Sequence, residues 1–411
     1  MSSLKETDPE VYDLVRAEES RQQDSIRLIA SENDTSQAVM EATGSVFTNK
    51  YSEGYPGKRY YEGQENTDKV EVLARERAEE LYGAEHANVQ PYSGSPANLE
   101  AYYALLEVGD PILGMGLPYG GHLTHGWGVN FSGRFFDAHH YAVDEETERL
   151  NYDAIAEQAR EVEPEMIVCG ASAYPRTIDF ERFAEIANDV DAYLLADIAH
   201  ISGLVASGVH PSPVPVADVV TTTTHKTLRG PRGGLILCKD EHAKAIDKAV
   251  FPALQGGPHM HAVAAAAVAF KEALEPDFTD YSEQIVANSR AMAEELKKRD
   301  FRLVAGGSDN HLVLIDMVAS RDIGGKPAST ALSEAGIVSN ANSIPFDERG
   351  PFDPSGLRIG TSSVTTRGMK EDEMTQIVEW IDAAIEARDD EDALASIRRE
   401  VREFCNDYPT P

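Results

Sequence analysis

The sequence predicts an α/β fold in which a mostly parallel sheet carries helices on both faces, followed by a smaller α+β domain. Up to Pro276, short apolar runs alternate with helical patterns, as in βαβ units. Beyond that residue the pattern changes to a long helix and shorter, separated apolar runs. We therefore divide the chain into an N-terminal arm and interface segment (1–50), a large α/β domain (51–276) and a small α+β domain (277–411).

The arm begins with about 30 residues that read as helical and polar and have little apolar surface to bury. We expect it to pack on another element, such as a second subunit. The segment 49–61, NKYSEGYPGKRYY, is too irregular for a helix or strand. It is either an ordinary surface loop or part of a site. Its tyrosines, interleaved with Glu53, Lys58 and Arg59, favour a site.

Two helices are predicted at the start of the large domain. Apolar residues recur at steps of three and four over 67–82, and Gly83 is placed to end that helix. The turn Ser93-Gly94-Ser95-Pro96 leads into a second helix that runs to about residue 108, with Ser95 as N-cap and Pro96 at N1. Free backbone N–H groups and two hydroxyls make this turn either an anion site suited to phosphate or a plain helix cap.

The predicted strands are the apolar runs 111–115, 166–170, 193–198, 219–224 and 235–238. Lys226 follows a β-branched strand and precedes a glycine-rich turn, a position at which a lysine can form a Schiff base with an aldehyde or simply be solvated. Asp197 ends another buried apolar run. A buried carboxylate is costly unless it pairs with a cation, so Asp197 either has such a partner or caps the start of a helix. Ligands of open α/β sheets bind at such strand ends. The ring nitrogen of pyridoxal phosphate would be a suitable cation for Asp197.

Two further glycine-rich segments are candidate binding loops. Residues 120–126, GGHLTHG, hold two histidines: His122 could stack on a flat ring, or His122 and His125 together could bind metal. We expect no metal, because His-x-x-His without a nearby acidic ligand is poor zinc spacing. The turn 255–258, which contains Gly256 and Gly257, exposes N–H groups that could hold phosphate or merely form a turn.

The small domain is predicted from five segments and a final helix. A helix covers 281–299, and apolar runs follow at 301–304 and 311–316. A helix over 328–335, the run 357–360 and one last amphipathic helix complete the domain.

The charge excludes two classes of partner. The chain has 411 residues, with 37 Lys and Arg against 70 Asp and Glu, a net charge of −33. It has no basic footprint for nucleic acid, and an anionic membrane would repel it. The acid is spread over the whole length, which fits a high-salt cytoplasm, since the Debye length is only ~3 Å at ~1 M salt.

The cysteines and apolar runs predict a soluble cytoplasmic protein. The three cysteines include no Cys-x-x-Cys pair and give no disulfide framework. The N-terminus is polar and does not resemble a signal peptide, and the longest apolar run, 262–270, is too short to cross a bilayer.

Four segments together resemble the serine hydroxymethyltransferase family. They are 49–61, 120–126, VVTTTTHKTLRGPRGG at 219–234, and GLRIGTSSVTTRG at 356–368, and the likeness extends from Leu28 to about Gly368. The resemblance implies a fold-type I pyridoxal-phosphate enzyme with a seven-stranded, mostly parallel sheet. It also implies a homodimer or homotetramer whose active sites are shared between subunits.

The resemblance also implies residue roles. Lys226 would carry the cofactor, Asp197 would hold its ring nitrogen, and His122 would stack on the ring. Arg358 would grip the amino-acid carboxylate with the help of Ser31, and Glu53 would be an acid/base group beside Tyr61. Further cofactor contacts would be Ser93, Gly94, Ser95, Ser172, His200, Thr223 and His225, with Tyr51, Gly256 and Gly257 from the neighbouring subunit. The catalytic set would be Lys226, Glu53, His122, Asp197 and His225.

The implied reaction is the reversible transfer of the hydroxymethyl group of serine to a reduced pterin, tetrahydrofolate, which yields glycine for one-carbon metabolism. The pterin would lie near Leu117, Gly121, Leu123, Asn342, Gly350, Pro351 and Phe352. Pro96 stands where the family pattern has Gln, at little cost in the first turn of a helix. The acidic loop 346–349 leaves the carrier open between folate and a methanopterin-type analogue.

Two other functions fit parts of the pattern. A threonine aldolase-like relative would share the cofactor and the lysine but would need no pterin. A cofactor-bound but catalytically idle protein would not need Glu53, His122, Asp197, Lys226 and Arg358 together.

Overall fold

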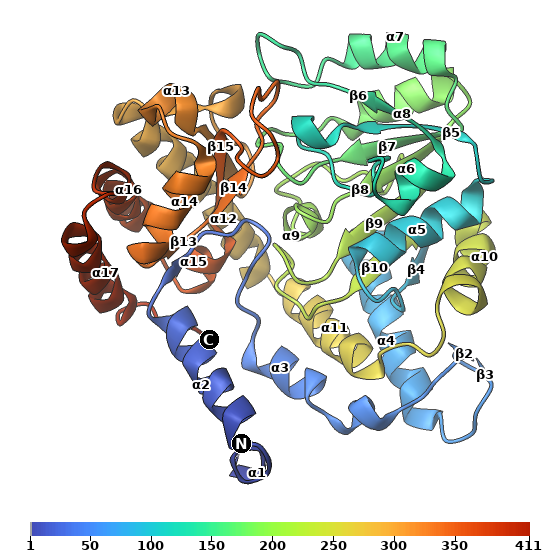
Figure 1. Cartoon of the computed structure of the whole chain (residues 1–411). Coiled ribbons are helices and arrows are strands. Elements are labelled where there is room, and N and C mark those ends of the chain that lie inside the picture. The colour runs from blue at the N-terminus through green and yellow to red at the C-terminus, as the bar shows by residue number, and fades with distance from the viewer. Residues whose placement is uncertain (1) are drawn as a thin grey trace.

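The computed structural model describes residues 2–411 and has two lobes (Figure 1). The large lobe is built on a seven-stranded sheet with the order β4-β10-β9-β8-β7-β5-β6. Only β10 runs antiparallel to its neighbours. The strands are β4 (His86–Asn88), β5 (Pro111–Met115), β6 (Asp137–Tyr141), β7 (Met166–Gly170), β8 (Tyr193–Asp197), β9 (Val219–Thr223) and β10 (Gly234–Cys238). The predicted strands and their mostly parallel pairing are confirmed.

Helices cover both faces of this sheet because its strands are apolar on both sides. Leu194 and Ala196 of β8 pack into one apolar cluster with α4, α7, α8 and α11, whereas Leu195 packs into another with α5 and α10. The large-domain helices are α4 (Glu65–Tyr82), α5 (Gly94–Leu105), α6 (Phe131–Phe135), α7 (Tyr152–Val162), α8 (Phe180–Asp189), α9 (Ser202–Ala206), α10 (Asp240–Lys248) and α11 (Met260–Ala273). Gly83 ends α4 in the left-handed conformation, as predicted.

The start of α5 differs from the prediction. Ser93, not Ser95, is the N-cap, because its backbone is extended while Gly94 and Ser95 are already helical. Pro96 therefore occupies the third helical position, still within the first turn, where a backbone N–H has no partner inside the helix. The helix also ends earlier than expected, at Leu105.

The small lobe holds a four-stranded antiparallel sheet with the order β11-β12-β15-β14. Its strands are β11 (Arg302–Leu303), β12 (Leu312–Asp316), β14 (Asn340–Asn342) and β15 (Gly356–Gly360). Its helices are α12 (Asp277–Lys298), α13 (Met317–Arg321), α14 (Gly325–Glu334), α15 (Ser362–Thr366), α16 (Glu371–Glu386) and α17 (Glu391–Cys405). The prediction of one final helix is wrong: Asp390 caps a second helix, α17, by accepting from the N–H of Ala393.

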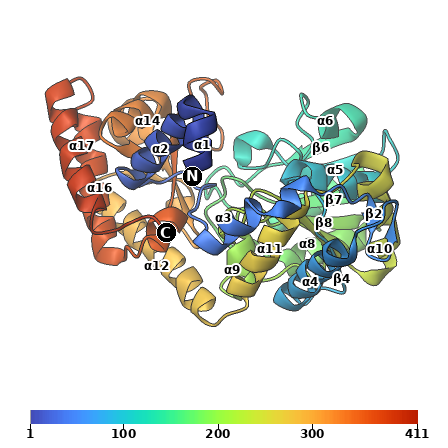
Figure 2. The same ribbon diagram turned by 90° about the horizontal axis from the view of Figure 1, so that it is seen from below.

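The N-terminal arm crosses from the small lobe to the large one. Helices α1 (Ser2–Thr7) and α2 (Pro9–Gln23) lie on the small-lobe side (Figure 2), and α2 has no buried residue. Strand β1 (Ile26–Arg27) pairs with β13 (Ile337–Val338) of the small lobe. Helix α3 (Gln37–Thr43) then packs on α11, and a hairpin of β2 (Gly54–Tyr55) and β3 (Lys58–Arg59) follows.

None of the helices within residues 2–411 is long and apolar enough to cross a membrane.

Candidate active site

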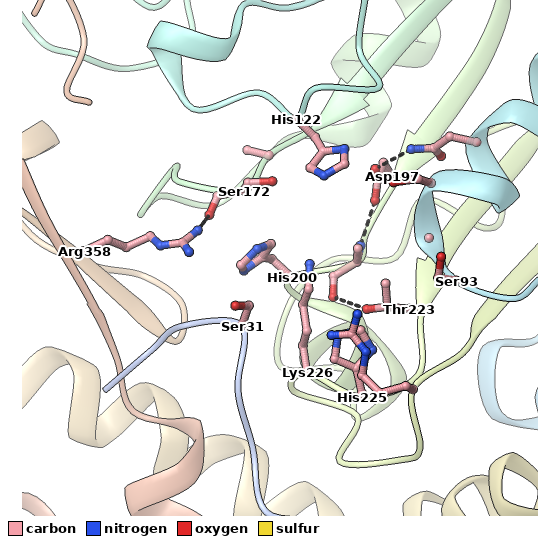
Figure 3. A pocket seen from close by; sticks show the side chains of 16 residues that line it. Ser31, Ser93, His122, Ser172, Asp197, His200, Thr223, His225, Lys226 and Arg358 are labelled. Carbon is pink, nitrogen blue, oxygen red and sulfur yellow. Dashed lines mark hydrogen bonds between the residues drawn. The ribbon is translucent and has the colours of Figure 1, made fainter. Parts of the chain in front are cut away.

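A cavity of about 340 Å³ lies at the carboxyl ends of β7, β8 and β9, where the small lobe meets the large one. Register explains why these ends meet: Asp197 of β8 pairs with Gly170 of β7 and with Thr221 of β9. In Figure 3, Arg358 and Asp197 lie on opposite sides of the cavity, with Lys226 and His200 between them. The predicted residues that line it are Ser31, Ser93, Gly94, Ser95, His122, Ser172, Asp197, His200, Thr223, His225, Lys226 and Arg358.

Lys226 lies just beyond β9, and hydrogen bonds fix its backbone and the turn that follows it. The side-chain amide of Asn33 donates to the carbonyl of Lys226 at 2.9 Å, and the N–H of Gly230 closes the turn onto the carbonyl of Thr224 at 2.7 Å. Burial lowers the pKa of the Lys226 ammonium to about 8, although the nearby Asp197 carboxylate opposes this shift. An amine with this pKa is roughly one-tenth uncharged at pH 7 and can attack an aldehyde.

Asp197 is kept ionised by its hydrogen bonds. Burial raises its pKa, but the ring of His125, 3.0 Å from Oδ2, and the amide of Asn98, at 2.9 Å, act in the other direction. The backbone N–H of Ala199 adds a third bond, to Oδ1, at 3.0 Å. The net result is a pKa below the usual range of an aspartate. A buried carboxylate held this way can pair with a cationic ring nitrogen.

His122 presents an uncharged ring to the same cavity. Its Nδ1 lies 2.7 Å from the hydroxyl of Thr124, which fixes the orientation of the ring. Burial lowers the pKa of His122 to about 4. A neutral imidazole that lines a cavity can stack on a flat aromatic ligand.

The end of the cavity next to α5 favours an anion. Ser93, Gly94 and Ser95 form the N-terminus of that twelve-residue helix. Arg232 lines the same cavity and donates to Nε2 of His225 at 3.1 Å, while Nδ1 of His225 is buried and has no hydrogen-bond partner among the described residues. Burial first, and then the charges of Arg232 and Lys226, lower the pKa of His225 to about 3. A helix N-terminus beside an arginine is a suitable site for phosphate.

Arg358 enters from strand β15 of the small lobe. Its Nη1 donates to the carbonyl of Ser172 at 2.7 Å, and its Nε donates to Oδ1 of Asn340 at 3.2 Å. Burial lowers its pKa to about 10, so the guanidinium stays charged at neutral pH. The two oxygens that Arg358 contacts are uncharged, and its Nη2 donates to neither of them. Arg358 has no carboxylate partner among residues 2–411, and such a charged, oriented guanidinium can bind the carboxylate of a small molecule.

Five predicted residues gather elsewhere, on an exposed surface. Tyr61 donates to Oε2 of Glu53 at 2.9 Å, and the hydroxyl of Tyr51 lies 3.4 Å from Oε1. A Cβ on Gly256 would lie 3.4 Å from the same Oε1, and one on Gly257 would lie 3.3 Å from the Tyr51 ring. We call Tyr51, Glu53, Tyr61, Gly256 and Gly257 the tyrosine cluster. None of its members lines the cavity of its own chain.

The residues predicted to bind a pterin come from two loops that approach each other. The loop 117–123 of the large lobe contacts the 340–352 segment through Tyr119 and Phe346, whose ring centroids are 5.3 Å apart. Phe352 is 96% exposed, and Leu123 is 40% exposed. The remaining predicted members, Leu117, Gly121, Asn342, Gly350 and Pro351, lie along the same two loops. Their grouping as one binding site stays a prediction.

Three residues at the cavity do not stand out in the sequence. Asn98 and Arg232 line the cavity, and His125 contacts Asp197 from behind. Asn98 follows the Ser93–Ser95 turn by one helical turn, a spacing that places it on the same face. In the sequence, the spacing of His125 from His122 indicates only a possible metal pair. Within residues 2–411 no group of three or more His, Cys, Asp and Glu side chains is arranged to hold a metal.

The charges of the cavity match a phosphorylated aldehyde with a basic ring nitrogen, together with an amino acid. Among the sixteen described residues that line it, Asp197 is the one carboxylate, and it faces Lys226, Arg232 and Arg358. The cations suit a phosphate, a carboxylate and an aldehyde, and the carboxylate suits a ring cation. Pyridoxal phosphate has these groups, so the residues fit this cofactor.

Comparisons with known proteins agree with this arrangement. Residues 4–381 match the family model of serine hydroxymethyltransferase. A serine hydroxymethyltransferase from Sorangium cellulosum (strain So ce56) is 59% identical over 411 residues, which cover all of this chain and 97% of that protein. Another from Acidothermus cellulolyticus is 57% identical, over all of this chain and 97% of its own length. The chain therefore belongs to the serine hydroxymethyltransferase family.

Proposed function

We propose that this protein transfers the hydroxymethyl group of serine reversibly to tetrahydrofolate, giving glycine and the methylene form of the carrier. Family membership over the full length supports the reaction. The observation that carries the proposal is the convergence of Lys226, Asp197 and Arg358 on one cavity. These groups match an aldehyde, a ring cation and a carboxylate, which are the parts of pyridoxal phosphate and an amino acid that need to be bound.

The cofactor would be held at three points. Lys226 would hold its aldehyde carbon, Asp197 its ring nitrogen, and the N-terminus of α5 with Arg232 its phosphate. When bound, pyridoxal phosphate supplies an electron sink that stabilises a carbanion formed on the substrate. Asp197 would favour a positive charge on the ring nitrogen, because the hydrogen bonds from His125 and Asn98 keep the carboxylate ionised.

The chain's own residues would orient the substrate and move protons. Arg358 would bind the carboxylate of serine, and the carbonyl of Ser172 and the amide of Asn340 hold the guanidinium in place. Lys226, with a pKa of about 8, can give and take a proton near neutral pH. Lys226, Asp197 and Arg358 are all strongly buried, and a polar contact is stronger in such surroundings than in water.

We also propose that two subunits complete each active site. The tyrosine cluster lies outside the cavity of its own chain, and two of its members, Tyr51 and Tyr61, are 60% and 47% exposed. Glu53, a carboxylate placed between two phenols, is suited to moving the hydroxyl proton of serine. A homo-oligomer would bring this cluster to the cavity of a second copy.

We propose that the protein is located in the cytoplasm. All three cysteines, Cys169, Cys238 and Cys405, are free and buried, which suits a reducing compartment.

The reaction is tested with purified protein, pyridoxal phosphate and serine, with and without tetrahydrofolate, by measuring glycine. We expect glycine formation that requires the pterin. Pterin-independent cleavage of β-hydroxy amino acids alone would favour the aldolase alternative, and turnover with only a methanopterin-type carrier would correct the carrier.

Subunit sharing is tested by mixing two inactive variants, Lys226→Ala and Glu53→Gln, under conditions that exchange subunits. Each mixed dimer would hold one intact site if the sites are shared, so activity should return to about a quarter of the wild-type value. Mixtures that stay inactive although subunits exchange would place Glu53 and Lys226 in the site of the same chain.

A further inference from the structure

His311 of the small lobe does not line the cavity, but it contacts His200, which does. His311 precedes β12 and is fully buried, and its Nε2 lies 3.2 Å from Nδ1 of His200. His200 follows β8 of the large lobe and lines the cavity beside Lys226, whereas His311 does not line it. The two rings are stacked at 30° with centroids 5.4 Å apart. The contact therefore joins the two lobes directly behind the cavity wall.

Both imidazoles are uncharged at neutral pH. Burial lowers the pKa of His311 to about 3, and the charges of Arg358 and Lys226 add to this effect. Burial also places the pKa of His200 well below its ordinary value, and the charges of Lys226 and Arg358 lower it further. A contact between nitrogens of two neutral imidazoles holds one proton, so one ring donates and the other accepts.

The surroundings of His311 indicate the direction of this hydrogen bond. The backbone carbonyl of Ala30 faces the His311 ring and favours a proton on it, although Nδ1 of His311 falls short of a well-aligned hydrogen bond. With Nδ1 protonated, Nε2 of His311 is the acceptor and Nδ1 of His200 is the donor. The remaining nitrogen of His200, Nε2, is then an unprotonated acceptor.

The backbone of His200 is fixed separately from its ring. Its carbonyl accepts from the hydroxyl of Thr227 at 3.1 Å, and that hydroxyl also accepts from the N–H of Gly203 at 2.9 Å. These bonds locate the residue but do not involve its imidazole ring. The contact with His311 does involve the ring, so His311 acts on both the orientation and the tautomer of His200.

We propose that His311 is a positioning residue for the transfer reaction: it keeps Nε2 of His200 available as the acceptor for a hydroxyl held in the cavity. This inference rests on the proposed function. Because Arg358 also belongs to the small lobe, this lobe would both bind the carboxylate of serine and orient the ring of His200. The hydroxyl belongs either to the cofactor or to serine, and the two sources give different experimental results.

The test compares His311→Leu, which removes the acceptor, with His311→Gln, whose amide oxygen can still accept. His210→Leu is the matched control, because His210 is also buried and bonded, to Ile178 N–H at 3.3 Å and to the Pro211 carbonyl at 2.9 Å, but lies outside the cavity. For each variant we would measure thermal unfolding, the absorption spectrum of bound pyridoxal phosphate, the Kd values of serine and glycine, and kcat.

We expect kcat to fall roughly tenfold in His311→Leu, the effect of losing one hydrogen bond in the cavity, and to recover to within about threefold in His311→Gln. A changed cofactor spectrum without amino acid would identify the cofactor's hydroxyl. A weaker Kd for serine with an unchanged Kd for glycine would identify the substrate's hydroxyl.

The proposal is overturned if His311→Leu loses thermal stability as His210→Leu does but keeps the wild-type spectrum, Kd values and kcat. It is also overturned if His311→Gln is no better than His311→Leu. A wild-type protein without turnover would instead refute the proposed function, and the spectra of the variants would still test the role of His311.

Discussion

The ring of His125 lies 3.0 Å from Oδ2 of Asp197, and both side chains are buried. This contact, together with the bond from Asn98, outweighs the effect of burial on the carboxyl group and keeps its pKa low. His125 and Asn98 therefore maintain the negative charge of Asp197, with which a cationic ring of a cofactor would pair.

Replacing His125 by Leu should weaken the binding of pyridoxal phosphate. With one donor removed, burial raises the pKa of Asp197, and we expect the Kd of the cofactor to rise roughly tenfold. The measurement is a titration of the empty protein with pyridoxal phosphate. His86→Leu is the control, because His86 makes a similar contact, 2.9 Å to Asp247, away from the cavity. Equal effects of the two substitutions would show that the contact with Asp197 has no special role.

Replacing Arg358 by Lys should raise the KM for serine while pyridoxal phosphate stays bound. A lysine keeps the charge but cannot bind the carboxylate, the Ser172 carbonyl and Asn340 with one planar group. Loss of one charged hydrogen bond corresponds to a roughly 100-fold increase in KM. Steady-state kinetics would measure it, with Arg160→Lys, on the surface of α7, as the control. An unchanged KM would remove Arg358 from the carboxylate site.

Attachment of the cofactor to the empty protein should depend on pH with a midpoint near 8. Only the uncharged amine of Lys226 reacts, and burial lowers its pKa from 10.5 to about 8. The rate of reconstitution should therefore rise up to about pH 8 and then level off. A rate that keeps rising toward pH 10.5 would mean that the lysine is exposed. Lys226→Ala gives the background reaction at other lysines.

The sign of the linked stability effect follows from the same shift. The folded-state pKa of Lys226 lies below the unfolded value, so the unfolded chain binds more protons between pH 8 and 10.5. This residue alone makes the empty protein more stable as the pH rises through that range.

Salt should stabilise the protein. The net charge of −33 opposes the compact state, and at ~1 M salt the Debye length of ~3 Å screens this repulsion. We expect the Tm in 2 M KCl to exceed that in 0.1 M KCl by ~10 °C. Thermal unfolding over a KCl series measures the effect. Equal Tm values at low and high salt would refute the high-salt interpretation of the composition.

Much of the large lobe and of the cavity follows from the sequence by simple rules. Strands buried on both faces appear as continuous apolar runs, and parallel strands bring their carboxyl ends together. Lys226 and Asp197 each stand at such an end, so their proximity was predictable. The seven-stranded, mostly parallel sheet was expected from the resemblance rather than from periodicity, and the order of its strands was not predicted.

Other features depend on contacts that spacing does not reveal. His125 and His122 occupy the same loop, and only the folded loop turns one ring to Asp197 and the other to the cavity. Ser93 rather than Ser95 caps α5 because the backbone becomes helical at Gly94, and either serine suits a cap. The split between α16 and α17 was hidden because helical patterns run on both sides of Asp390. The tyrosine cluster lies away from the cavity because one chain does not bring residues 51–61 to its own strand ends.

The most direct test of the central claim is chemical trapping of the cofactor on the intact protein. The protein with bound pyridoxal phosphate is reduced with borohydride, digested and analysed by mass spectrometry. We predict one dominant phosphopyridoxyl adduct, on Lys226, absent from Lys226→Ala. An adduct on another lysine of a protein that turns over serine, or turnover by Lys226→Ala at the wild-type rate, would contradict the assignment of this cavity as the active site.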